Sequence, residues 1–178
     1  MHKTKEVYSI IIRYLLILAA AFPNLFIFYF IFTPLTLYAS YFVFNLFFDV
    51  SIMGNILIVN NYPLELINAC IAGAAYYFLF ILNLSIPKIK PKKTIKMLLF
   101  SFSLLLLINI LRIFLLGVLF FSEFSYFNIA HKLFWYSLSI VFVVGIWFIE
   151  VKLFKIKEIP IYSDLKFLYF NSSLRKKY

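Results

Sequence analysis

Three side chains of this sequence could together perform nucleophilic chemistry: a thiol, an imidazole and a guanidinium. Cys70 is the single cysteine, Arg112 lies within a long apolar run, and His131 follows that run. A thiol attacks as its thiolate, which a nearby cation stabilises. An imidazole can take the thiol proton and deliver it to a leaving amine. A guanidinium can hold the oxyanion of a tetrahedral intermediate or the carboxylate of a peptide. The trio predicts acyl transfer through Cys70, provided that the fold brings it together.

Each of these residues also has an ordinary structural explanation. A lone cysteine in a membrane helix is usually a small buried hydrophobe. A histidine at a helix end is usually a polar interfacial residue, and an arginine can snorkel or bind loop carbonyls. Lys132, near a helix end, is expected only to snorkel. Two histidines and one cysteine are too few for a structural zinc site, so no metal and no cofactor is expected.

The composition is that of an integral membrane protein. Of the 178 residues, 65% are hydrophobic, 22% aromatic and 13% charged, and the mean hydropathy is +0.98. Soluble domains carry about 25% charged residues, so a soluble globular domain and intrinsic disorder are both excluded. The formal net charge of +10 is concentrated in three short regions and does not indicate a nucleic-acid partner.

The predicted fold is an all-α membrane protein with one domain, residues 1–178, and about four transmembrane helices. A crossing needs about 20 apolar residues. Four stretches qualify: Tyr8–Phe32, Leu66–Ser85, Met97–Phe121 and Leu133–Ile149. Residues 150–178 form a basic tail.

The segment Thr33–Glu65 is apolar but interrupted by prolines, Asp49 and Gly54. We expect Thr36–Phe48 to form a helix in the outer interface, with a re-entrant path left open. The pieces Asn55–Val59 and Leu64–Ile67 are strand-like around the turn Asn60-Asn61-Tyr62-Pro63. The sequence therefore predicts a hairpin-like element before the second crossing.

Basic residues predict the orientation. Nearly all of the 17 Lys and Arg residues lie near the N-terminus, in the loop Ile86–Lys96 or in the tail. By the positive-inside rule these regions, and hence both termini, are cytoplasmic. An even number of crossings must then separate the N-terminus from that loop, so Thr33–Glu65 stays outside. A further crossing at Pro34–Phe48 would place the basic loop outside.

This arrangement puts the three reactive side chains at related depths. At 1.5 Å per residue, Cys70 lies about 6 Å inside the outer end of its helix and Arg112 about 14 Å inside the outer end of the next. His131 lies at the outer rim, after the short loop Ser122–Ala130. All three fall in the outer half of the membrane, where a small bundle could join them.

The order of the motifs resembles the exosortase/archaeosortase family of membrane transpeptidases. The matching pieces are Cys70-Ile71-Ala72-Gly73, Asn109-Ile110-Leu111-Arg112 and His131. Short archaeal members are the most similar in length. In the commoner family form glycine stands two residues after the cysteine, whereas here Ala72 precedes Gly73.

The resemblance implies a membrane-embedded cysteine peptidase that sorts proteins to the cell surface. It implies Cys70 as nucleophile, His131 as general acid/base and Arg112 as oxyanion or substrate stabiliser, with Asn109 and Gly73 in support. The implied partners are exported proteins with a C-terminal signal made of a short motif, a transmembrane helix and a basic end. The enzyme would cleave near the motif on the outer face and transfer the new C-terminus to a membrane lipid.

Two other functions compete with this one. A small membrane assembly or scaffold subunit would use the three residues only for packing, and Cys70→Ala would then change nothing. A small transporter would bind an anion at Arg112, but would need a polar path through the inner halves of the helices. The recognised motif, the acceptor, the oligomeric state and the roles of Glu65 and Glu123 stay open.

Overall fold

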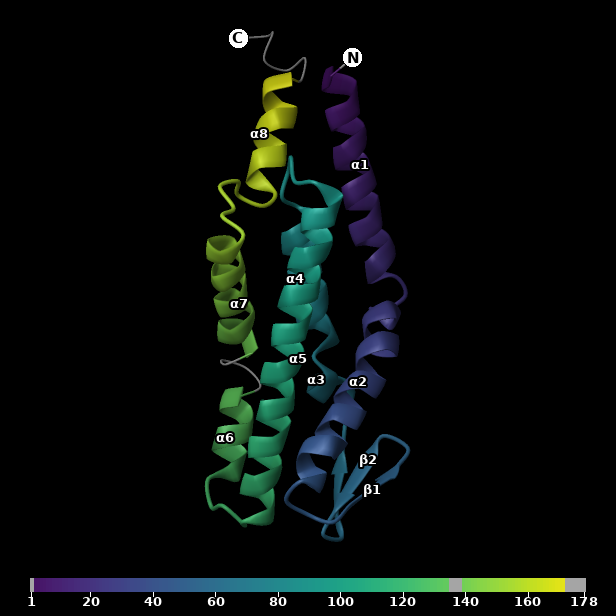
Figure 1. The fold of residues 1–178 in the computed structure, drawn as a ribbon, viewed down its shortest axis with the longest axis vertical. Helices are drawn as coiled ribbons and strands as arrows, with labels where there is room; N and C mark the ends of the chain where they lie inside the picture. The colour runs from purple at the N-terminus through teal and green to yellow at the C-terminus, as the bar shows by residue number, and fades with distance from the viewer. Residues whose placement is uncertain (1, 135–138, 172–178) are drawn as a thin grey trace.

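The computed structural model describes residues 2–134 and 139–171, which form an elongated, mostly helical bundle (Figure 1). Helix α1 (His2–Ala21) starts at one end, and α2 (Phe26–Asn45) continues toward the other. The stretch Tyr8–Phe32, expected as one helix, is divided at residues 22–25. Pro23 lacks a backbone N–H, and Asn24 and Leu25 have φ of 48° and 60°, a left-handed conformation that no α-helix continues through.

Helix α2 joins the end of the predicted first crossing, Tyr8–Phe32, to the predicted interfacial helix, Thr36–Phe48. It runs through Pro34 without ending, and six of its residues, Phe28 and Phe44 among them, are buried. The expected interfacial helix Thr36–Phe48 is therefore not a separate element. Its residues up to Asn45 are the second half of α2, which packs beside α5, because the apolar side chains on both sides of Pro34 bury against the same neighbour.

A small antiparallel sheet follows α2, with strands β1 (Val50–Met53), β2 (Ile56–Val59) and β3 (Tyr62–Glu65) in the order β1-β2-β3. The turn between β2 and β3 is Asn60-Asn61, both with positive φ, which suits a tight two-residue hairpin. The predicted hairpin is thus confirmed, but Tyr62 and Pro63, expected in the turn, belong to β3, which ends at Glu65. Strand β1 was not foreseen.

The second apolar stretch, Leu66–Ser85, is also interrupted. It contains the single-turn helix α3 (Asn68–Ile71) and helix α4 (Gly73–Leu84), separated by Ala72 with φ of 60°. Helix α5 (Pro91–Phe121) is longer than the predicted Met97–Phe121. It includes half of the basic loop because Pro91, at its first turn, needs no N–H partner there.

The remaining helices are α6 (Phe127–Leu133), α7 (Ser139–Leu153) and α8 (Tyr162–Asn171). The predicted fourth crossing, Leu133–Ile149, includes residues 135–138, which lie outside the described ranges, as does the end of the tail, 172–178. Within the described part of that tail, α7 continues through Glu150 to Leu153, and α8 follows.

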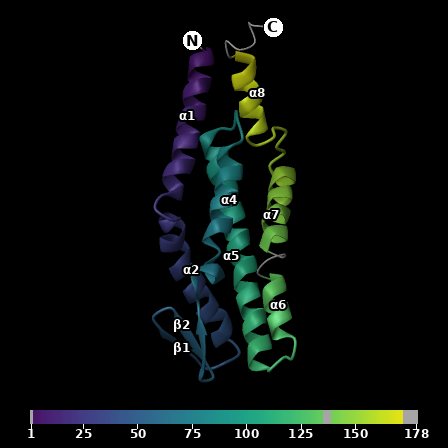
Figure 2. The ribbon, with the colours of Figure 1, turned by 180° about the vertical axis from the view of Figure 1, so that it is seen from behind.

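Two helices, α2 and α5, are each long and apolar enough to cross a membrane. Large apolar side chains also cover the outside of the bundle, for example Phe30, Phe42 and Phe148, as expected of a surface in contact with lipid. Figures 1 and 2 show the N-terminus, the α4–α5 connection and α8 at one end, and the sheet and the α5–α6 connection at the other.

Polar contacts join the helices toward the end that carries the N-terminus. Arg13 of α1 forms an ion pair with Asp164 of α8 at 2.8 Å. Deeper in the bundle, Asn83 of α4 donates to the Glu150 carboxylate of α7 at 3.1 Å and to Ser101 of α5 at 3.4 Å. These contacts join α1 to α8 and α4 to α5 and α7. They use polar side chains that lower the hydropathy of the apolar segments.

Candidate functional site

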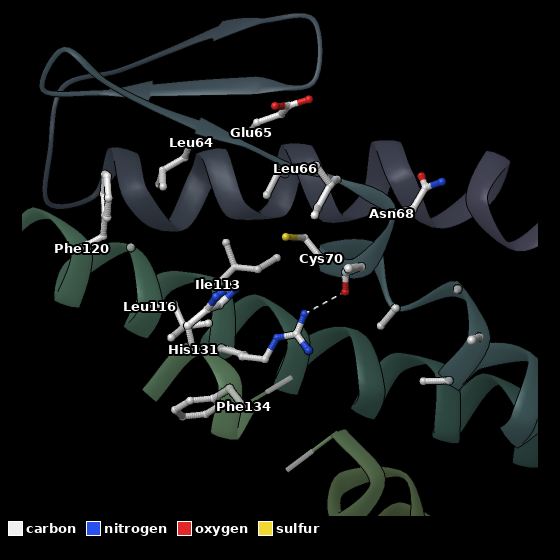
Figure 3. A pocket seen from close by; sticks show the side chains of 18 of the residues that line it. Leu64, Glu65, Leu66, Asn68, Cys70, Ile113, Leu116, Phe120, His131 and Phe134 are labelled. Carbon is white, nitrogen blue, oxygen red and sulfur yellow. Dashed lines mark hydrogen bonds between the residues drawn. The ribbon is translucent and has the colours of Figure 1, made fainter. Parts of the chain in front are cut away.

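Cys70 lies in the single turn of α3, directly after the sheet. Leu66, which follows β3, is buried and donates its N–H to the Asn55 carbonyl at 3.0 Å, which fixes the exit of the strand. The Cys70 N–H then donates to the Ile67 carbonyl at 2.8 Å. The thiol is partly buried, and in Figure 3 its sulfur points into a cavity bounded by β3 and α5.

Gly73 begins α4 and allows α2 to approach. A Cβ at this position would lie 2.7 Å from two ring carbons of Tyr29, which is too close for any side chain. Gly73 therefore supports the site by packing, since it lets the Tyr29 ring close one wall of the cavity.

Asn109 and Arg112 hold the turn that carries the thiol. They lie one turn apart on α5, and Asn109 is 3% exposed. The Asn109 amide donates to the Cys70 carbonyl at 2.7 Å, and Arg112 Nη2 donates to the Ala69 carbonyl at 3.2 Å (dashed line in Figure 3). Because a one-turn helix leaves its carbonyls without intrahelical partners, these two side chains supply donors where α3 lacks them.

His131 lies on α6 and is partly buried. Its ring stacks on Phe127, with centroids 5.7 Å apart and planes 6° from parallel. In Figure 3 the imidazole lies on the α5–α6 side of the cavity, near Leu116 and Phe134. The neighbouring Lys132 is exposed and does not line the cavity, in keeping with an ordinary helix-end lysine.

One cavity of about 420 Å³ joins these residues. It is lined by Cys70 from α3, Arg112 from α5 and His131 from α6, so the three side chains singled out in the sequence surround a common space. Most of the other lining groups are apolar, including Leu66, Ile113 and Phe120, and the strand residues Pro63–Glu65 form the wall nearest the sheet.

Arg112 and Glu65, two residues of opposite charge, line the same cavity as the thiol. Glu65 is an exposed lining residue of the cavity, at the end of β3. Glu123, the other acidic residue whose role was open, follows α5 and does not line the cavity. A cation, a thiol and an imidazole around an apolar space can therefore act together on a bound carbonyl compound.

Comparison with protein-family models, with curated proteins and with solved structures finds no match to this chain. The resemblance to exosortases and archaeosortases therefore depends on the order of the motifs and on the residues described above.

Proposed function

We propose that this protein is a membrane-embedded cysteine transpeptidase that cleaves exported proteins near their C-terminus and transfers the new C-terminus to an acceptor. The observation that carries the proposal is the common cavity of Cys70, Arg112 and His131, which come from α3, α5 and α6. These elements are far apart in the sequence, and the three side chains are the types that acyl transfer requires.

In the first step His131 takes the thiol proton, and Cys70 Sγ attacks the carbonyl carbon of the scissile peptide bond. Arg112 lies against the cavity and can hold the oxygen that becomes negative as the C–S bond forms. Collapse of the tetrahedral intermediate breaks the C–N bond, and His131 gives its proton to the leaving amine. The products are a thioester on Cys70 and a released C-terminal peptide.

In the second step an acceptor attacks the thioester. His131 takes the proton of an acceptor hydroxyl, the new C–O bond forms, and the C–S bond breaks. His131 then returns the proton to Cys70, which restores the starting state. A lipid hydroxyl yields a lipid-anchored protein and water yields simple hydrolysis.

The proposed orientation places the cavity at the outer face. The basic loop between α4 and α5 lies at the opposite end of the bundle from the sheet, and basic ends are retained in the cytoplasm. A substrate anchored by its own C-terminal helix, and a lipid acceptor, would both reach the cavity by diffusion in the membrane.

The direct test is capture of the thioester. The protein is co-expressed with exported proteins of the same genome that end in an apolar helix and a basic tail. Membranes are then treated with hydroxylamine, which cleaves thioesters. We expect a covalent adduct on Cys70 that hydroxylamine removes, leaving a C-terminal hydroxamate that mass spectrometry locates in the substrate.

Two variants control this test. Cys70→Ala should form no adduct, and Gly145→Ala, whose added Cβ meets nothing within 4 Å, should behave as the native protein. Adduct formation by Cys70→Ala, or full processing in its membranes, would contradict the proposal and favour the membrane scaffold subunit.

A further inference from the structure

Strand β3 is an edge strand, and it leads directly to the Cys70 turn. The sheet order is β1-β2-β3, so β3 has β2 on one side and no strand on the other within the described residues. Backbone groups on such an edge require water or a further strand, because hydrocarbon cannot satisfy them.

The register of the sheet identifies which groups are unpaired. In an antiparallel pair, residues that exchange hydrogen bonds alternate with residues whose N–H and C=O point away. Leu66 donates to Asn55 at 3.0 Å, and the preceding pair is Ile56 with Glu65. Glu65 therefore faces Ile56 without hydrogen bonds, and its N–H and C=O project from the outer edge of β3.

The other side of β2 agrees with this assignment. Asn60 donates to the Asp49 carbonyl at 2.9 Å. Counting along the register from this bond, the backbone N–H and C=O groups of Ile56 and Ile58 point toward β1 and away from β3. Pro63 lies two residues before Glu65 on the same edge and has no N–H. The edge therefore offers one complete donor–acceptor pair, at Glu65, with a single additional acceptor at Pro63.

This edge is continuous with the reactive cavity. Pro63, Glu65 and Cys70 all line it, and Figure 3 shows the chain continuing from Glu65, the end of β3, through Leu66 to the Cys70 turn. A chain paired with Glu65 in extended form would need only a few more residues to reach the thiol, since each extended residue spans about 3.3 Å.

We propose that the substrate polypeptide binds in extended form as a fourth strand on the outer edge of β3, paired through the backbone N–H and C=O of Glu65. This inference rests on the proposed function and names how that same site holds its substrate. Backbone pairing supplies affinity without regard to sequence, and alternate side chains of the bound segment enter the apolar cavity and supply selectivity. Pro63 restricts the pairing to a short segment, which prevents edge-to-edge association of two sheets.

The test compares Glu65→Pro with Glu65→Ala. Both remove the carboxylate, but only proline removes the outward N–H, and the hairpin does not use that N–H. The probe is a synthetic peptide copied from the residues around the cleavage junction of the captured protein. We expect KM to be about three- to tenfold higher for Glu65→Pro than for Glu65→Ala, the effect of one hydrogen bond.

Two further measurements distinguish loss of the hydrogen bond from a folding defect, which could also raise KM. Alkylation of Cys70 by iodoacetamide should proceed at the same rate in both Glu65 variants. In a second series the peptide carries an ester in place of one backbone amide at a time. We expect the ester to raise KM at a single position that is distant from the scissile bond, and esters at the positions on either side of it to leave KM unchanged.

Equal KM values for the two variants, together with no sensitive ester position, would overturn β3 pairing. The proposed function would survive that result as long as Cys70 still forms the thioester. Failure of thioester formation with every candidate protein would instead remove the proposed function itself.

Discussion

Two arginines of this protein donate to backbone carbonyls of the α3–α4 segment and have different surroundings. Arg13 of α1 forms an ion pair with Asp164 at 2.8 Å and donates to the Leu84 carbonyl at 3.2 Å. Arg112 of α5 donates to the Ala69 carbonyl at 3.2 Å and faces a cavity that also contains the Cys70 thiol. Each arginine thus supports one end of the broken α3–α4 segment.

The difference lies in the side chains that surround each guanidinium. The charge of Arg13 is neutralised by a carboxylate that is 2% exposed, so that pair ties α8 to α1. Arg112 instead lines the cavity that holds the Cys70 thiol, where the proposed mechanism forms an oxyanion. Under the proposed function, Arg13 serves stability and Arg112 serves chemistry.

The largest expected effect is that of Cys70→Ala. It should abolish processing of exported substrates and leave the protein folded and inserted, because a small apolar residue replaces a small, nearly apolar one. The measurement is substrate processing in membranes with matched protein levels. Cys70→Ser should also be nearly inactive, since a hydroxyl ionises far less readily than a thiol. Normal processing by either variant would contradict the contrast between the two arginines, because the surroundings of Arg112 would then serve only structure, as those of Arg13 do.

Replacement of His131 should be the next most damaging change. His131→Ala should slow processing by about 10²–10⁴ at neutral pH, the usual contribution of a general acid or base. The rate should rise with pH, since the thiol then ionises without a base. A pH–rate profile of the native protein and the variant checks this. A profile of unchanged shape and height would assign His131 to packing against Phe127.

Arg112→Lys tests whether the guanidinium matters beyond its charge. A compact ammonium lacks the planar fork of donors, so processing should fall by about 10²–10³, as on loss of an oxyanion donor. Arg13→Lys is the matched control and should change the processing rate only a few-fold. Full activity of Arg112→Lys would reduce Arg112 to a point charge or an anchor for α3.

The smallest effect on processing, and the clearest on stability, is expected from Arg13→Ala. It leaves the buried Asp164 carboxylate without its cation, which should cost roughly 3 kcal/mol of unfolding free energy. Unfolding by denaturant in detergent measures this. The double variant Arg13→Ala/Asp164→Ala should regain part of the loss. An undisturbed stability would show that α8 docks through its apolar contacts instead.

The sequence predicted that Cys70, Arg112 and His131 would lie near one another, and all three line one cavity, whereas the path of the chain was predicted less well. The depth argument counted Cys70 along a helix that begins at Leu66, whereas Cys70 lies in the single turn α3, which begins at Asn68. Cys70 is near Arg112 because this turn packs against α5. The break at residues 22–25 was missed because apolar residues continue across it, and Pro23 gave no stronger signal than Pro34, which α2 tolerates.

Polar contacts between distant residues were also beyond sequence reasoning. Asp164 and Glu150 fall within residues 150–178, which were predicted only as a basic tail, yet they are 2% and 0% exposed. Their partners Arg13 and Asn83 are about 150 and 67 residues away in the chain, and no local pattern connects them. A bond from Arg112 to loop carbonyls was the ordinary alternative given for this residue, and its bond to the Ala69 carbonyl fits that alternative. The bond from Asn109 to the Cys70 carbonyl was not foreseen, although the Asn-x-x-Arg spacing placed both residues on one face of a helix.

The central claim is that Arg112 and His131 activate the thiol of Cys70 whereas Arg13 does not. The most direct measurement is the rate of Cys70 alkylation by iodoacetamide across pH, in the native protein and in Arg112→Gln, His131→Ala and Arg13→Gln. Cys70 is the single cysteine, so every alkylated molecule reports on this site. We expect Arg112→Gln and His131→Ala to react more slowly at neutral pH and to approach the native rate at high pH, with Arg13→Gln equal to the native protein throughout. Four coincident profiles would contradict the claim.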